Sequence, residues 1–262
     1  MSFKMNRSTL NVIVRICLFW ALLYAGKFLF FILPPDLPQK LIIGIVGTFL
    51  ALGLTICFLK IESKRLPDIG FVFSFGSFRR FWLGAILGIA IIGIILSVLI
   101  MFSPLKLEPV AAPNILNIFA YSAVVMFAMA LMEEIIFRGY PLVKLQETIG
   151  VRGAIYVTSV IFGLYHGLTV ESLIGPAVWG LLYGLMAVWS KGIALPTGLH
   201  FGLNWAQGFV GMKNEYVEPL WEFAVSESST NLSSDTIGLI FQLLLFLTAV
   251  ILIEYYIRTK HL

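Results

Sequence analysis

Three clusters of polar residues interrupt otherwise apolar stretches of this chain, and their side chains are of the kinds that carry out hydrolysis. The clusters are Glu133, Glu134 and Arg138; Phe162 and His166; and His200 and Asn204. An ionisable side chain inside a bilayer costs about 2.5 kcal/mol or more, so those present usually face a cavity and have a function. Two carboxylates, two imidazoles, a guanidinium and an amide therefore indicate a buried hydrolytic site.

The spacing within the first cluster gives its two carboxylates different surroundings. Glu134 and Arg138 are four residues apart, so they share a helix face and are expected to form an ion pair. Glu133 points about 100° away from Glu134 and has no partner in its own helix. A buried carboxylate without a cation partner can act as a base near neutral pH. We therefore expect Glu133 to be the base and Glu134 to be structural.

Each cluster taken alone also has a purely structural explanation. Glu134 with Arg138 could be an ion pair at the membrane edge, and each histidine could form an interhelical hydrogen bond. Counted from Lys144, Arg152 and Lys191, however, Glu133, His166 and His200 lie roughly 16, 21 and 14 Å from the cytoplasmic edge at 1.5 Å per helical residue. Three clusters at a similar depth favour one shared site.

The composition indicates that the elements positioning these residues are membrane helices. Hydrophobic residues make up 59% of the 262 residues and charged residues 12%, and the mean hydropathy is +0.95. Soluble domains carry about 25% charged residues. A helix needs about 20 apolar residues to cross the hydrocarbon core. Four runs near that length carry no charge: 41–59, 81–102, 115–132 and 237–253.

Four weaker runs complete the predicted architecture. They are shorter, interrupted by Gly or Pro, or contain isolated charges: 9–33, 153–165, 175–189 and 192–211. Helices satisfy every backbone polar group within the segment, and no alternating pattern suggests a barrel. We predict an all-α, polytopic integral membrane helix bundle of about eight transmembrane helices, with residues 1–262 forming a single membrane domain.

The distribution of basic residues predicts the orientation. Of the 18 Lys and Arg, 13 fall in one alternate set of connections and termini and 3 in the other. The richer set comprises the N-terminus, 60–80, 138–152, 190–191 and the C-terminus. Positive residues remain on the cytoplasmic side, so both termini are expected there, in a multi-pass protein of the cell membrane. The net charge of +4 reflects this topology, and nucleic acid is not an expected partner.

Several other residues are expected to serve packing or membrane contact. The stretch 71–80 combines four Phe with two Arg, so it is either an interfacial segment or an ordinary cytoplasmic loop. Paired glycines are expected where helices approach closely, and large aromatics at interfaces or in packing. These are Gly84, Gly88, Gly180, Gly184, Gly198 and Gly202, and Trp179, Tyr183, Trp189 and Trp205.

The three clusters, read in order as Glu-Glu-x-x-x-Arg, Phe-x-x-x-His and His-x-x-x-Asn, resemble the CPBP family of intramembrane proteases. That family includes the CAAX prenyl endopeptidases and the bacterial Abi proteins. The resemblance covers roughly residues 115–211, which would form the catalytic core. Each motif alone is weak, whereas the ordered set of three is specific.

The resemblance implies a role for each motif residue. Glu133 would activate the attacking water, and His166 would help to hold that water. His200 and Asn204 would stabilise the oxyanion of the tetrahedral intermediate. Glu134 would fix its helix through its ion pair.

The resemblance also implies a substrate class. Phe162 would pack beside the site, against the bound substrate. The activity would be endoproteolysis of a membrane-associated or prenylated CAAX-type substrate, a peptide or lipidated protein held in the lipid bilayer.

Cofactor use and two other function classes remain open at the level of the sequence. Glu133, His166 and His200 could form a zinc ligand set, although the His-Glu-x-x-His signature is absent and a metal-free mechanism is preferred. The same polar residues could instead serve an ion-coupled transporter, which would be expected to show an inverted repeat. They could also belong to a non-proteolytic binding or immunity protein.

Overall fold

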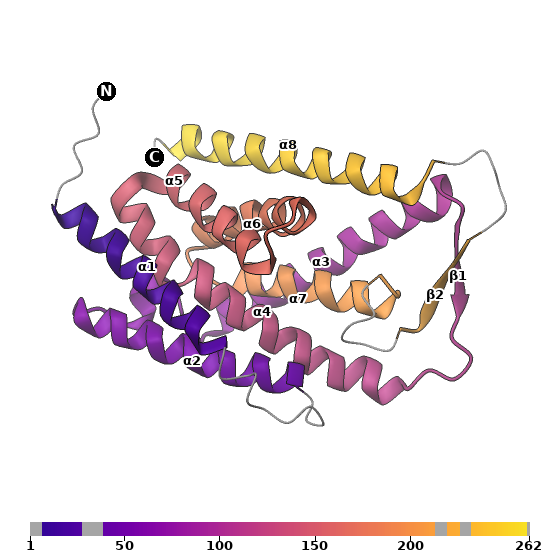
Figure 1. Ribbon diagram of the computed structural model, residues 1–262, viewed down its shortest axis with the longest axis horizontal. Coiled ribbons are helices and arrows are strands. Elements are labelled where there is room, and N and C mark those ends of the chain that lie inside the picture. The colour runs from indigo at the N-terminus through magenta and orange to yellow at the C-terminus, as the bar shows by residue number, and fades with distance from the viewer. Residues whose placement is uncertain (1–6, 28–38, 213–218, 226–231, 261–262) are drawn as a thin grey trace.

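The chain folds into a bundle of helices, as the sequence predicts (Figure 1). The computed structural model describes residues 7–27, 39–212, 219–225 and 232–260. Within these ranges there are eight α-helices. Their bounds are α1 Arg7–Lys27, α2 Gln39–Ile61, α3 Phe75–Phe102, α4 Ser122–Arg138, α5 Tyr140–His166, α6 Val170–Ser190, α7 Ala194–Phe209 and α8 Ser234–Lys260.

The helices have the length and surface of a membrane bundle. Six segments of the described chain are long and apolar enough to cross a membrane, with α4 and α5 counted together as 117–166. The outer faces carry exposed aliphatic residues, such as Leu83 and Ile86 on α3 and Leu243 on α8. A soluble protein would bury such a continuous apolar surface, so this is a multi-pass helical membrane protein.

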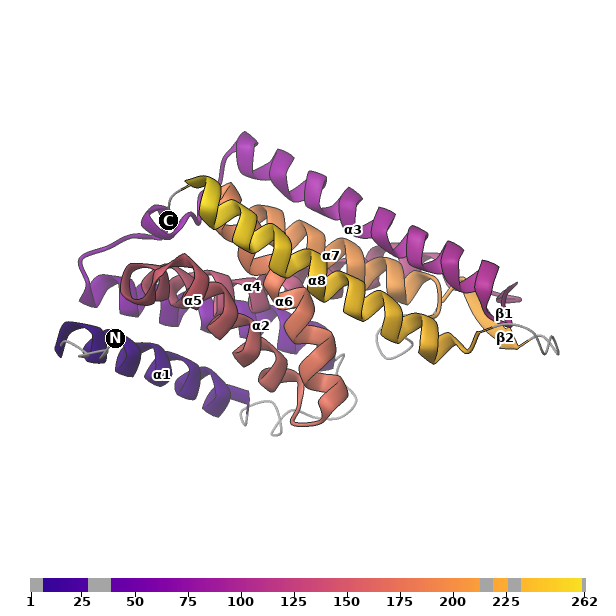
Figure 2. The same cartoon turned by 90° about the horizontal axis from the view of Figure 1, so that it is seen from above.

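The two ends of the bundle differ. Helix α1 begins and α8 ends at the same end, while a small sheet lies at the opposite end (Figures 1 and 2). In this sheet β1, Leu105–Pro109, pairs antiparallel with β2, Trp221–Val225, with Leu107 opposite Phe223. The sheet was not predicted, because its two strands are short and lie far apart in the sequence.

Glycines bring α3 and α7 into direct backbone contact, as predicted from their spacing. A Cβ atom added to Gly88 would lie 2.6 Å from the carbonyl oxygen of Leu199. Additions at Gly84, Gly198 and Gly202 would also overlap backbone atoms of the facing helix. The packing fixes α7, and therefore His200, against α3.

The stretch 138–152, expected to be an inner connection, is mostly helical. Helix α5 starts directly after Gly139 with Pro141 in its first turn, where a proline is tolerated. Gly150, with φ 78°, interrupts the helical geometry and bends α5. Helices α4 and α5 are therefore joined by a single residue.

A polar network fastens α1 and α2 to this α4–α5 turn. The Glu62 carboxylate accepts hydrogen bonds from Arg15 at 3.2 Å and from the Tyr140 hydroxyl at 2.8 Å. It also pairs with Lys144 at 2.8 Å. Burial alone would raise the pKa of Glu62, but Lys144, Tyr140 and Arg15 together hold this pKa below its ordinary value of 4.5.

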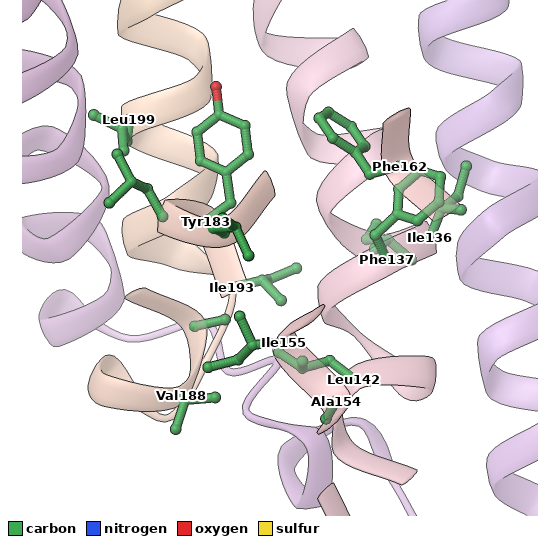
Figure 3. Close-up of a cluster of buried hydrophobic side chains, with 14 of the residues drawn as sticks. Ile136, Phe137, Leu142, Ala154, Ile155, Phe162, Tyr183, Val188, Ile193 and Leu199 are labelled. Atoms are coloured by element: carbon green, nitrogen blue, oxygen red, sulfur yellow. The ribbon is translucent and has the colours of Figure 1, made fainter. Parts of the chain in front are cut away.

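The main hydrophobic core of the bundle is formed largely by side chains of α4, α5, α6 and α7. Figure 3 shows Phe137 and Phe162 side by side, with Tyr183 facing them from α6. Phe162 meets Phe137 edge to face, with ring centroids 5.1 Å apart. These rings lie beside the last turns of α4 and α5, where the first two polar clusters are found.

Candidate active site

The last turn of α4 carries the first polar cluster in full burial. Glu133, Glu134 and Arg138 are 6%, 0% and 1% exposed. Arg138 Nη1 lies 3.4 Å from Glu134 Oε1, which confirms the predicted pair. Arg138 Nη2 donates to the carbonyl of Gly180 at 3.1 Å, and the guanidinium lies over the Phe162 ring at 4.3 Å. Three different groups therefore hold the buried cation.

His200 from α7 bridges the two carboxylates. Its Nδ1 lies 2.9 Å from Glu134 Oε1, and its Nε2 lies 3.6 Å from Glu133 Oε2. A carboxylate accepts hydrogen bonds, so Nδ1 carries the proton in this contact and Nε2 faces Glu133. Glu134 thus orients His200 as well as pairing with Arg138.

His166 reaches the same carboxylate from α5. Its Nδ1 donates to the carbonyl oxygen of Phe162 at 2.8 Å, one turn earlier in the helix. Its Nε2 lies 3.8 Å from Glu133 Oε2. Two imidazole Nε2 atoms therefore face Glu133, and Glu133 Oε2 is buried with no hydrogen-bond partner in the described chain.

The separations around Glu133 are too long for direct hydrogen bonds, and a water lying to one side of each pair could bridge it. Distances of 3.6 and 3.8 Å exceed those of direct hydrogen bonds, which end near 3.2 Å. A cavity of about 250 Å³ opens beside the imidazoles between α5, α6 and α7. Its walls include Phe162, His166, His200 and Asn204, and its volume exceeds that of several waters.

All seven residues predicted from the sequence thus lie at or directly behind one cavity. Glu133 lies next to the two imidazoles, while Glu134 and Arg138 support the site from behind. The sequence placed Glu133, His166 and His200 at a similar depth. In the structure both histidines lie within 4 Å of Glu133. The sequence therefore located this polar site within the bundle.

One residue of the site was expected from the sequence only as an interface or packing aromatic. Tyr183 on α6 stacks on the His200 ring, with centroids 4.6 Å apart and an interplanar angle of 16°. The Arg138 guanidinium lies 5.2 Å from the Tyr183 ring, and Phe162 meets the same ring edge to face. Tyr183 therefore contacts both partners of Glu134, Arg138 and His200. The one signal in the sequence is that Tyr183 lies three residues after Gly180, a glycine expected at a helix-packing position, and so shares its helix face.

The described residues do not form a metal-ligand set. Within these ranges, no three His, Cys, Asp or Glu side chains are arranged so that they could hold a metal ion. The zinc set considered from the sequence, Glu133, His166 and His200, is not among such groups, although both Nε2 atoms lie within 4 Å of Glu133 Oε2.

The fold and site define a class of protein: a multi-pass helical membrane protein with paired carboxylates and imidazoles buried around a cavity. Residues 115–206 match the model of a family described as type II CAAX prenyl endopeptidase Rce1-like. The matched segment contains all three motifs and confirms the resemblance to intramembrane proteases of the CPBP type. Comparisons with curated proteins and with solved structures gave no match.

Proposed function

We propose that this protein is an intramembrane endopeptidase that hydrolyses a peptide bond in a membrane-associated or prenylated CAAX-type substrate. The observation that carries the proposal is the environment of Glu133. Its buried Oε2 lies within 4 Å of the Nε2 atoms of His166 and His200, and these two histidines line the cavity of about 250 Å³. The match of residues 115–206 to a CAAX endopeptidase family supports the same reaction class.

In this mechanism Glu133 activates a water molecule. The water lies between Glu133 Oε2 and His166 Nε2, where a hydrogen-bonded bridge spans the 3.8 Å gap. Its oxygen attacks the peptide carbonyl carbon while Glu133 takes its proton. When the C–N bond breaks, Glu133 delivers that proton to the leaving nitrogen. The products are a carboxyl terminus and a free amine.

His200 and Asn204 would stabilise the tetrahedral intermediate. His200 Nδ1 donates to Glu134, so Nε2 can donate to the oxyanion only when the ring is an imidazolium. The formal charges of Glu133, Glu134, Arg138 and this imidazolium then cancel. As Glu133 takes the proton, the negative charge moves to the oxyanion, and the buried site keeps the same net charge.

The decisive experiment is cleavage of a peptide panel by the purified protein in detergent. The panel contains a farnesylated CAAX peptide, its unprenylated counterpart and a scrambled peptide, each with and without a chelator. We expect cleavage of the prenylated peptide that Glu133→Gln abolishes. Binding of this peptide without cleavage would contradict the proposal and indicate a non-proteolytic binding protein.

A further inference from the structure

A second cavity lies outside the candidate active site. It measures about 460 Å³ and lies where the segment before α3 and the first turns of α3 meet the middle of α4 and the start of α7. Its walls are almost entirely apolar; they include Phe71, Phe73, Phe78, Trp82, Phe127 and Leu131. We call this cavity the α3 groove.

The α3 groove and the catalytic cavity have no lining residue in common. Helix α7 contributes Ala194 and Thr197 to the groove, but His200 and Asn204 to the catalytic cavity. On the groove side, the rings of Phe81 and Phe201 stack 5.6 Å apart. A molecule in the groove would therefore contact a different face of α7 from a substrate at Glu133.

The segment that forms the groove is held by specific hydrogen bonds. The backbone N–H of Phe71 donates to the carbonyl of Leu66 at 3.1 Å, and Ser77 Oγ donates to the carbonyl of Val72 at 2.6 Å. Gly70, with φ 73°, packs against the backbone of Gly192 at the α6–α7 turn. These contacts preform the groove.

The groove lies at the end of the bundle where α1 begins and α8 ends, since α3 starts there (Figure 2). Its rim is aromatic and open: Phe73 is 89% exposed, and Phe78 and Trp82 are also exposed. Exposed aromatic rings of this kind are typical of the membrane–water boundary. Residues 75–80 of the stretch 71–80 form the first turns of α3, at one end of a candidate membrane span.

Two exposed cations stand close in sequence to residues that line the groove. Arg79 directly follows Phe78 and is exposed, and exposed Lys191 precedes Gly192 and Ile193. No ion pair within the described ranges includes either residue. By contrast, the neighbouring Arg80 donates to the carbonyl of Ser190 at 2.9 Å. An apolar groove with two free cations at a membrane boundary complements a molecule with a long hydrocarbon chain and an anionic headgroup.

We propose that the α3 groove binds an anionic glycerophospholipid of the adjoining leaflet. One acyl chain would lie along Phe71, Phe78 and Trp82, and the headgroup phosphate would lie near Arg79 and Lys191. This proposal is independent of the proteolytic function, because the two cavities have separate walls. Since a basic residue near a charged membrane surface strengthens binding about fivefold, losing both should weaken it more than about tenfold.

The test uses quenching of tryptophan fluorescence by brominated lipids in mixed micelles of the intact protein. Subtracting the signal of Trp82→Phe isolates the contribution of Trp82. We expect saturable quenching by brominated phosphatidylglycerol, and much weaker quenching by brominated phosphatidylcholine at the same mole fraction. Combined Arg79→Gln and Lys191→Gln should shift the phosphatidylglycerol midpoint more than about tenfold upward.

The charge-matched control replaces Lys60 and Lys260 by Gln, because both are exposed cations elsewhere on the bundle. Equal quenching by the two lipids, or an equal shift in the control, would overturn the proposal. Displacement of phosphatidylglycerol by a farnesylated peptide would also overturn it and assign the groove to substrate. Native mass spectrometry, counting phosphatidylglycerol retained by the wild type and the double variant, gives the same test if Trp82→Phe fails to fold.

Discussion

At the level of single residues, Glu133 differs from Glu134 in its partners. Each carboxylate has a buried Oε2 without a hydrogen-bond partner in the described chain. Glu134 Oε1 contacts Arg138 and His200, whereas Glu133 Oε2 faces two imidazole Nε2 atoms at 3.6 and 3.8 Å. We expect Glu133→Gln to reduce cleavage at least about 100-fold, because an amide cannot accept the proton of water. Thermal unfolding should change little, since the shape is conserved. Near-native turnover by a folded Glu133→Gln protein would disprove the assignment.

The ion pair behind the site predicts a non-additive effect on stability. Arg138→Ala removes a buried cation from Glu134 and should cost about 3–5 kcal/mol in the free energy of unfolding, along with activity. Adding Glu134→Gln removes the uncompensated charge, so the double variant should recover part of the loss. The recovery is partial because Glu134 also binds His200. Thermal unfolding of both variants measures this recovery. A double variant less stable than Arg138→Ala alone would refute the pairing.

Tyr183 predicts a difference between two substitutions. The ring, stacked on His200, should hold the imidazole with Nδ1 toward Glu134. Tyr183→Phe keeps the ring and should retain most activity, whereas Tyr183→Leu should lower it several-fold and release His200. The chain has three histidines, so ¹⁵N-histidine NMR can follow the ring-nitrogen signals of His200 directly. An unchanged His200 signal in Tyr183→Leu would show that the ring does not position it.

At the level of elements, the features predicted correctly from the sequence are those that depend on local composition and spacing. The apolar runs located the eight helices, and the four-residue spacings placed the polar residues on common faces. The β1–β2 pairing and the packing of Gly180 against Arg138 depend on contacts between distant segments. Local periodicity contains no information about such contacts. For the same reason, Tyr183 could be identified as an aromatic residue in a span but not as the neighbour of His200.

The network around Glu62 makes a prediction about the attachment of α1. Glu62→Gln should lower the unfolding temperature at pH 7, because it weakens contacts with Arg15 and Lys144 together. The depressed pKa of Glu62 means that its charge stabilises the fold above the ordinary pKa of 4.5. That contribution is lost as the pH falls through the folded-state pKa, so wild type and variant should converge in acid.

The matched control for Glu62→Gln is Glu108→Gln, an exposed glutamate on β1 at the other end of the bundle. It should leave the unfolding temperature unchanged at every pH. A difference between wild type and Glu62→Gln that persists below the folded-state pKa would contradict the charge-based explanation.

At the level of the whole molecule, the distribution of charge predicts the orientation in the membrane. Thirteen of the 18 basic residues lie in the set of segments that includes both termini. The structure places the start of α1 and the end of α8 at one end, and the β1–β2 sheet at the other. We propose that the first end is cytoplasmic, as the excess of positive residues requires.

Single cysteines at exposed positions on the two ends test this orientation. Lys260, at the end of α8, and Glu108, on β1, are suitable because both are exposed, whereas Lys144 is buried in its ion pairs. Cys17 and Cys57 are free and exposed, so they must be replaced first. In intact cells a membrane-impermeant thiol reagent should label Glu108→Cys and leave Lys260→Cys unlabelled until the cells are lysed. The reverse pattern would invert the protein. It would also remove the case for a CAAX-type substrate, because such a substrate reaches the membrane from the cytosol.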